Sequence, residues 1–324
     1  MAQPDEGAVA PADPKAPPVR KHGARDDFEH RVEEARAQFD ATNERIRART
    51  GRNLFAAIGI GLVLGGLFLV SLLVVKWLFM VLAAVLLGLT VFELAAALRF
   101  AGRDVPRVAS TVVAVATVPA AFFLGVEGLW LAVLAAVVLI TLWRLAEQLR
   151  PSHRTGVRAV AGDVGAGVLV QIYVTFLAGL YVVLVGLDGG EWWTLGSILV
   201  VVVTDVAAYA SGLTFGKHKL APSISPGKTW EGFIGSVLAA TVAGVLVALF
   251  MLGQPWWVGL VMGVLLALVG TMGDLTESLL KRDLGIKDIS TWLPGHGGFL
   301  DRLDSILPSA AVAYVIFLVA TSSG

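Results

Sequence analysis

Apolar segments long enough to cross a membrane dominate this sequence and constrain its fold more than any other feature. Hydrophobic residues make up 56% of the 324-residue chain and charged residues only 15%, whereas a soluble domain is usually less than half apolar. A membrane-crossing helix needs about 20 apolar residues. Such spans are predicted at residues 54–75, 77–98, 105–124, 128–145, 165–187, 194–214, 233–252, 256–275 and 305–321. The sequence therefore predicts an all-α, polytopic integral membrane protein with about nine transmembrane helices.

The N-terminal part differs in composition from the rest. Residues 1–21 are rich in proline, alanine and charge and are predicted to be disordered. A charged helix with a narrow apolar stripe is predicted to follow. Because the first residues lack the apolar core of a signal peptide, we expect the first span to act as a signal-anchor. The predicted organisation is a cytoplasmic tail over residues 1–53 and a transmembrane catalytic domain over residues 54–324.

Composition also argues against several classes of function. The formal net charge is zero, which is not typical of a nucleic-acid-binding protein. The chain has no cysteine, so it has no disulfide, no thiolate nucleophile and no cysteine-bound zinc. The sequence shows no paired repeat of the kind that transporters often contain.

Loop charge predicts the orientation in the membrane. Lysine and arginine are frequent in every second connection between the predicted spans and sparse in the others, and the basic connections lie at residues 99–107, 144–158, 217–228 and 281–302. Because cytoplasmic loops carry an excess of these residues, the N-terminal tail and these four connections are predicted to be cytoplasmic. The membrane itself is predicted to be the cell inner membrane. The loops richest in candidate chemistry would then share one face.

The stretch from 278 to 304 is strongly polar although it lies between two apolar spans. Its charged and titratable residues are Lys281, Arg282, Asp283, Lys287, Asp288, His296, Asp301, Arg302 and Asp304. Carboxylates bind hard divalent cations through oxygen, and lysine and arginine bind phosphate oxygens. The glycines at 295, 297 and 298 allow a backbone to approach a ligand closely. The stretch therefore favours a metal–nucleotide or metal–pyrophosphate ligand.

One helix face leads into this stretch. Asp274, Glu277, Ser278 and Lys281 follow the spacing i, i+3, i+4 and i+7, which places them on one side of a helix leaving the membrane. Asp274 lies among apolar residues, and an acid inside a membrane indicates a functional site. For Lys281 or Arg282 alone, a charge that reaches from the helix end into the headgroup region is the simpler interpretation.

The spacing of these residues resembles the signature of the phosphatidate cytidylyltransferases, the CDP-diacylglycerol synthases. The matching positions are Ser278, Lys281-Arg282, Lys287-Asp288, His296-Gly297-Gly298, Asp301-Arg302 and Asp304. The resemblance implies that Asp274 and Asp301 bind metal, with Mg²⁺ as the expected cofactor and Asp304 as a further candidate ligand. Asp274, Ser278, Lys281 and Asp301 are the predicted catalytic residues, and a homodimer is implied by the family alone.

A second loop resembles another block of the same family. Ser225-Pro226-Gly227-Lys228-Thr229-Trp230-Glu231-Gly232 has Gly227 where the family commonly has lysine. Predicted substrate-binding residues here and in the first stretch are Ser223, Ser225, Lys228, Thr229, Arg282, Lys287, His296 and Arg302. The triplet Gly-Lys-Thr is not a Walker motif, because position 222 is Pro222 rather than glycine and no strand is expected before it.

Three acids inside or beside the apolar spans have less specific roles. Asp205 and Tyr209 lie at i, i+4, similar to a further family block, and Asp205 is predicted either to orient ligands or to bond to a neighbouring helix. Glu93 and Asp163 are left unassigned, and the simplest account pairs each with a nearby arginine.

The resemblance implies that the phosphate of phosphatidic acid attacks the α-phosphorus of CTP, giving CDP-diacylglycerol and pyrophosphate for phospholipid biosynthesis. Such a reaction depends mainly on positioning and charge stabilisation. CTP and phosphatidic acid are thus the expected partners, together with membrane lipid. A related CTP-dependent membrane lipid transferase or kinase is the main alternative. A transporter fits less well, because the polar residues cluster in loops on one face, and a scaffold would leave the charged motif unexplained.

Overall fold

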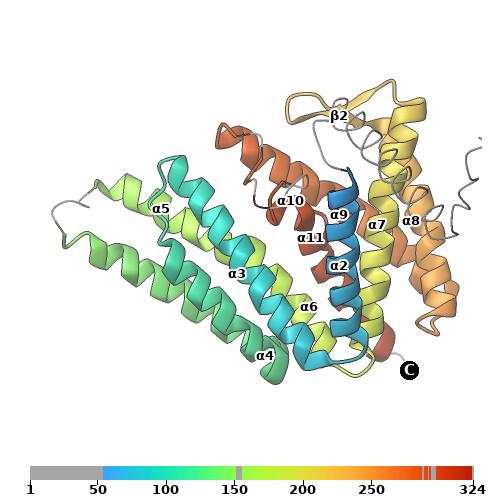
Figure 1. Cartoon of the computed structure of the whole chain (residues 1–324), viewed down its shortest axis with the longest axis horizontal. Coiled ribbons are helices and arrows are strands. Elements are labelled where there is room, and N and C mark those ends of the chain that lie inside the picture. The colour runs from blue at the N-terminus through green and yellow to red at the C-terminus, as the bar shows by residue number, and fades with distance from the viewer. Residues whose placement is uncertain (1–53, 151–154, 287, 291, 293–296, 323–324) are drawn as a thin grey trace, which may run out of the picture. The chain divides into compact units, whose positions relative to one another are not determined.

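The computed structural model describes residues 54–150, 155–286, 288–290, 292 and 297–322, without the side chains of residues 54–60 and 64. The predicted tail over residues 1–53 therefore lies outside the described residues. The elements in chain order are α2 (Leu54–Leu73), α3 (Lys76–Phe100), α4 (Arg107–Glu147), α5 (Val157–Val170), η2 (Gln171–Phe176), α6 (Leu177–Gly186), α7 (Gly190–Phe215), β1 (Lys219–Ala221), β2 (Ser225–Thr229), α8 (Trp230–Phe250), α9 (Trp256–Asp283), α10 (Leu300–Leu303) and α11 (Ile306–Ser322) (Figure 1). The transmembrane domain is helical, as the apolar runs predict.

The long element α4 is a pair of helices rather than one rod. A straight helix of its 41 residues would extend roughly 60 Å. Yet Arg144 near its end lies 3.9 Å from Asp104, just before its start. The chain reverses at Gly125, which has φ 67° and ψ −150°, a conformation that glycine adopts without a Cβ clash. The two legs correspond to the spans predicted at 105–124 and 128–145, and Figure 1 shows the reversal beside the label α4.

The predicted number of nine spans is not confirmed. Within the described residues, seven helices are long and apolar enough to cross a membrane. One difference arises because α4 is continuous across Gly125 and counts once. The other is α2, whose part with described side chains is the shorter apolar segment Gly61–Leu73.

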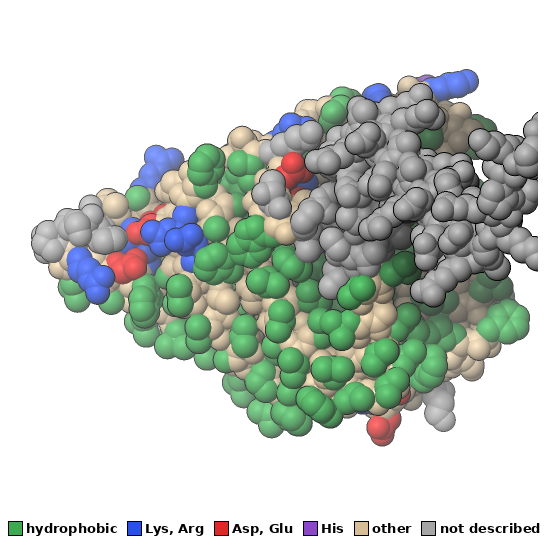
Figure 2. Space-filling model, viewed as in Figure 1, with side chains coloured by type: hydrophobic (Ala, Val, Ile, Leu, Met, Phe, Trp, Pro, Cys, Tyr) green, Lys and Arg blue, Asp and Glu red, His purple; other side chains and the backbone are tan. Residues whose placement is uncertain are grey.

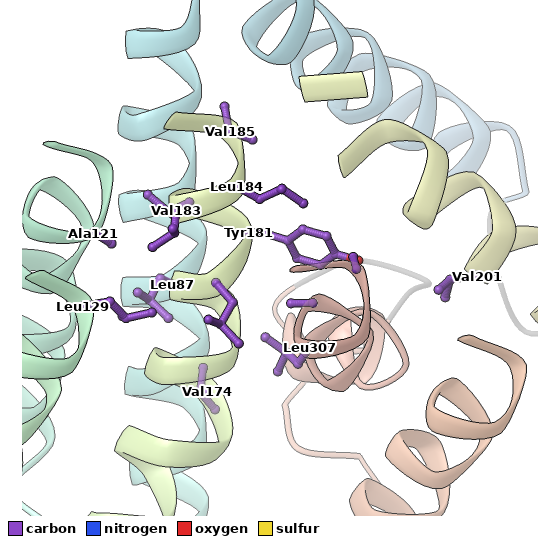
Figure 3. Close-up of a cluster of buried hydrophobic side chains, with 14 of the residues drawn as sticks. Leu87, Ala121, Leu129, Val174, Tyr181, Val183, Leu184, Val185, Val201 and Leu307 are labelled. Carbon is purple, nitrogen blue, oxygen red and sulfur yellow. The ribbon is translucent and has the colours of Figure 1, made fainter. Parts of the chain in front are cut away.

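The helices pack through apolar side chains and, in one place, through glycines. α7 packs on α8 and α8 on α9, while α11 contacts both α9 and α6. At Gly244, Gly259 and Gly263 an added Cβ would meet backbone atoms of the facing helix, so α8 and α9 approach as closely as small residues allow. Figure 3 shows part of the apolar core, including Leu87, Val174, Tyr181 and Leu307.

Charged side chains gather at one end of the helices. Figure 2 shows lysine and arginine along the upper and left margins of the described surface, whereas the coloured side chains of the lower part are mostly hydrophobic, with an acidic side chain at the lower edge. This one-sided distribution agrees with the alternation of loop charge in the sequence.

A buried ion pair closes the α4–α5 connection. Arg144 is 1% exposed and lies 2.8 Å from Asp163, which is 6% exposed. The backbone N–H of Asp104 donates to the same carboxylate at 3.0 Å. The expected pairing of Asp163 with an arginine is thus confirmed.

Replacing Arg144 by methionine should lower the free energy of unfolding by about 3 kcal/mol, because the substitution leaves the Asp163 carboxylate buried without its cation. Denaturant titration in detergent measures the change. Arg158→Met is the matched control, since Arg158 is exposed on α5 and its loss should change stability by less than about 0.5 kcal/mol. Equal stability of the two variants would contradict a structural role for the pair.

A small hairpin is a feature of the described fold that the sequence did not predict. β1 and β2 pair antiparallel, with Lys219 opposite Thr229 and Ala221 opposite Ser225. The expectation that no strand precedes Gly-Lys-Thr was therefore wrong, because the triplet lies in β2 and β1 comes before it. Alternation is hard to recognise in strands of three and five residues. The Walker motif stays excluded, since Pro222 stands where a glycine is required.

Candidate functional site

The hairpin is joined to the helix that follows it by two side chains. The Thr229 hydroxyl accepts a hydrogen bond from the backbone N–H of Gly232 at 3.1 Å and caps α8. Glu231 accepts hydrogen bonds from the backbone N–H groups of Lys217 and His218. Thr229 is 7% exposed, so its hydroxyl stabilises the helix start.

Lys228 and Asp274 form the centre of the candidate site. Lys228 on β2 makes an ion pair with the Asp274 carboxylate on α9, and the two side chains are 22% and 34% exposed. The Ser278 hydroxyl lies 3.4 Å from the other oxygen of Asp274. The pair joins two blocks far apart in the sequence, and both charges remain accessible to a ligand.

A cavity of about 380 Å³ opens beside this pair. Its lining combines an acid from α7, Asp205, with Asp274 from α9 and with Ser225 and Lys228 from the hairpin. Tyr209 lines it as well, as expected from its place one turn after Asp205. The cavity therefore offers hydroxyl, cationic and carboxylate groups together, which suits a phosphate-bearing ligand and a cation.

A second cavity of about 270 Å³ adjoins the hairpin and shares Ser225 with the first. Ser278, Lys281, Arg282 and Asp288 line it. The guanidinium Nε of Arg282 donates to the backbone oxygen of Ile224 at 3.3 Å. The cationic end of α9 thus faces the hairpin, and the two family-like blocks form one site.

Lys281 lies between two poorly exposed carboxylates. Its Nζ is 2.6 Å from Glu277, which is 1% exposed, and 3.0 Å from Asp301, which is 8% exposed. The other oxygen of Asp301 accepts from the backbone N–H of Gly298 at 2.7 Å. These contacts attach the glycine-rich segment to α9. They also engage both Asp301 oxygens, so a ligand that binds Asp301 has to replace or share these contacts.

Glu93 is a site residue that the sequence interpretation missed. It lies on α3 at 1% exposure, accepts from the backbone N–H of Leu300 at 2.9 Å, and accepts from the Ser290 hydroxyl. A Cβ added at Gly298 would clash with its carboxylate. The expected pairing of Glu93 with an arginine was wrong: the carboxylate holds the segment that carries Asp301. The only signal in the sequence was an acid inside an apolar span.

Glu93→Ala should lower kcat about 100-fold, because it removes two hydrogen bonds to a charged group worth together about 3 kcal/mol. Glu93→Gln should lose less than about tenfold, since its amide oxygen can accept from Leu300 and its NH₂ can donate to Ser290. KM for CTP, the substrate that the family resemblance implies, and kcat are measured separately for both variants. If Glu93→Ala and Glu93→Gln lost the same share of kcat, the negative charge of Glu93 would matter, and its hydrogen bonds to Ser290 and Leu300 would not.

The remaining predicted residues vary in their placement. Ser223 is exposed at the hairpin tip and lines neither cavity, and Arg302 is also exposed. Asp304 is within electrostatic range of Asp274, Asp205 and Lys228. Lys287 and His296 lie outside the described residues.

The carboxylates of the candidate site fit Mg²⁺ when water and substrate phosphates supply the other ligands. Within the described part of the chain, no three His, Cys, Asp or Glu side chains lie close enough to hold a metal by themselves. Mg²⁺ commonly binds through one or two carboxylates and completes its shell with water and substrate phosphates. Asp274, which is partly exposed beside the cavity, is the carboxylate best placed for this role.

Fold and site together define a polytopic membrane protein with a polar, phosphate-suited site at one end of its helices. Comparison with known proteins agrees: the cytidylyltransferase family matches residues 55–320. The chain belongs to this family. It is 36% identical over 324 residues to a phosphatidate cytidylyltransferase of Mycobacterium leprae, covering 98% of each chain. It is 38% identical over 276 residues to one of Mycobacterium bovis, covering 83% of this chain and 90% of the relative. A Brucella suis relative of the same name is 47% identical over 112 residues, 35% of this chain and 42% of the relative.

Proposed function

We propose that this protein is a phosphatidate cytidylyltransferase, which transfers CMP from CTP to phosphatidic acid and releases pyrophosphate. The observation that carries the proposal is the joining of two distant blocks: Lys228 of the hairpin pairs with Asp274 of α9, and Arg282 reaches the hairpin backbone at Ile224. The names of the mycobacterial relatives support the same activity. The residues brought together are those that a transfer between two phosphate-bearing substrates needs.

The side chains of this site have distinct roles in the proposed reaction. Lys228 and Arg282 bind phosphate oxygens of CTP and offset the repulsion between the triphosphate and the attacking phosphate. Ser225 and Ser278 donate hydrogen bonds from the walls of the two cavities. The deprotonated phosphate of phosphatidic acid is itself the nucleophile, so the reaction requires no general base. Lys281 holds Asp301 and the glycine-rich segment in place.

Mg²⁺ is the proposed cofactor. Asp274 would hold it, with Asp304 as a candidate for a second carboxylate. Asp301 would join only by exchanging its contacts with Lys281 and Gly298. A bound Mg²⁺ supplies charge stabilisation at the phosphates.

The proposed setting is the inner membrane, with the hairpin and the 278–304 stretch in the cytoplasm, where CTP is dissolved. The basic connections between the spans support this orientation. A homodimer is proposed from family resemblance alone.

A panel of lipid acceptors tests the substrate. Purified protein in detergent receives CTP and Mg²⁺ with phosphatidic acid, diacylglycerol or a prenol. The CDP-lipid and pyrophosphate of a cytidylyl transfer are quantified beside the phosphorylated lipid and CDP of a kinase reaction. We expect equal amounts of CDP-lipid and pyrophosphate with phosphatidic acid and no product with the other two lipids. Product from a prenol or diacylglycerol alone would overturn the assignment in favour of a related CTP-dependent lipid enzyme.

A further inference from the structure

An apolar cavity of about 280 Å³ lies inside the transmembrane domain and takes no part in the polar site. Side chains of α2, α3, α6, α7 and α11 form most of its wall. Figure 3 labels four of the lining residues, Leu87, Val174, Tyr181 and Leu307. Two of the three hydroxyls in the wall are engaged elsewhere, since Thr90 donates to Leu86 and Tyr181 bonds to Ser197, while the hydroxyl of Thr194 has no hydrogen-bond partner among the described residues. Apolar cavities of this kind stay dry and accept apolar ligands.

The cavity is elongated along the helices. Its lining follows α3 from Phe79 to Thr90, a rise of roughly 16 Å at 1.5 Å per residue. Thr90 is one helical turn from Glu93, whose carboxylate holds Leu300 and Ser290. One end of the cavity therefore lies one turn of α3 from Glu93, the residue that holds the segment carrying Asp301.

The short helix α10 connects the cavity with the polar site. Its Asp301 pairs with Lys281, and its Leu303 lines the apolar cavity. Asp304, the next residue, is within electrostatic range of Asp274 and Lys228. α10 thus lines the apolar cavity through Leu303 and contacts, through Asp301, the Lys281 side chain that lines the smaller polar cavity.

We infer that this cavity holds an acyl chain of the lipid substrate while the phosphate of that lipid lies at the polar site. The inference rests on the proposed function and specifies the helices that receive the lipid. A substrate with a phosphate at one end and hydrocarbon at the other needs adjoining spaces of both kinds. An acyl chain that moves from the membrane core into the cavity exchanges one apolar environment for another, so its transfer has no desolvation cost.

Filling the cavity tests the inference. Gly65 on α2 lines it, and an added Cβ there would meet nothing within 4 Å, so Gly65→Leu places a side chain in open space. Ala83→Leu narrows the same cavity from α3. Gly61→Leu is the matched control, because Gly61 lies one turn earlier on α2, does not line the cavity and also has nothing within 4 Å of an added Cβ.

The measurement is kcat/KM for dioleoyl and dihexanoyl phosphatidic acid, together with the amount of each lipid retained in native mass spectrometry. Gly65→Leu and Ala83→Leu should lower kcat/KM for the dioleoyl lipid about tenfold, which corresponds to about 1.4 kcal/mol, because the new side chain crowds the acyl chain in the cavity. They should change the value for the dihexanoyl lipid by less than about twofold, which also shows that the variants are folded. Retention of the dioleoyl lipid should fall in parallel, and Gly61→Leu should behave as wild type.

Two outcomes would overturn the inference. If Gly65→Leu and Ala83→Leu both kept the wild-type ratio of kcat/KM for the two lipids, the acyl chains would bind elsewhere. An equal loss with both lipids in a folded variant would mean that the cavity supports the fold and not the chain. Absence of turnover with either lipid in the wild-type protein would instead count against the proposed function, and lipid retention would still report on the cavity.

Discussion

Asp274→Asn should reduce the rate of nucleotidyl transfer by about a thousandfold, the upper end of the scale for loss of one electrostatic contribution to the transition state, because the variant no longer holds the cation that stabilises the phosphates. Asp274 is the partly exposed carboxylate that pairs with Lys228, bonds to Ser278 and lines the 380 Å³ cavity. Asparagine keeps the size of the side chain and loses its negative charge. The variant therefore loses both the partner of Lys228 and the proposed ligand for Mg²⁺.

The matched control for this variant is Asp283→Asn on the same helix. Asp283 is exposed at the end of α9 and lines neither cavity of the site, so its variant should keep at least about half of the wild-type rate. The comparison uses initial rates over a range of Mg²⁺ concentrations. Retention of more than about a tenth of the wild-type rate in Asp274→Asn would contradict the central role given to this carboxylate.

Lys281→Met should abolish activity and also lower the free energy of unfolding by about 3–5 kcal/mol. The substitution removes the cation between Glu277 and Asp301, which are 1% and 8% exposed. Two carboxylates would then lie close together and poorly hydrated without a compensating charge. Release of the Asp301 segment from α9 is the expected structural result.

Denaturant titration in detergent and the transfer assay are made on the same preparation of this variant. Lys219→Met, a change at an exposed lysine of β1, should leave stability within about 0.5 kcal/mol of wild type. A Lys281→Met protein of wild-type stability would contradict the structural role of the Glu277–Lys281–Asp301 contacts. The loss of activity of Lys281→Met would then be caused by weaker substrate binding alone.

The apolar runs predicted the helical elements well because membrane-crossing length is a strong local signal. The position of Gly125 between two predicted spans also matched the reversal of α4. The hairpin β1–β2 escaped prediction because its strands of three and five residues are too short for alternation to emerge. Local pattern carries little information about such an element.

The candidate site was predicted in part. The helix-face argument placed Asp274, Ser278 and Lys281 together, and the resemblance added Lys228, which lies beside Asp274 as an ion-pair partner. Spacing along one helix carries this information because i, i+4 neighbours share a face.

Glu93 could not be assigned in the same way. Its hydrogen-bond partners Ser290 and Leu300 are 197 and 207 residues away in the sequence, and only the packing of α3 against α10 brings them together. For the same reason spacing did not reveal that Asp301 contacts Lys281 rather than Asp274.

The most direct test of the central claim follows the phosphorus atoms of CTP. Purified protein receives phosphatidic acid, Mg²⁺ and CTP labelled with ³²P at either the α or the γ position, and the lipid and aqueous products are separated. Our account predicts α label in the lipid, γ label in pyrophosphate, and neither product from Asp274→Asn. Transfer of the γ label to the lipid would contradict it, because that outcome defines a CTP-dependent lipid kinase and not a cytidylyltransferase.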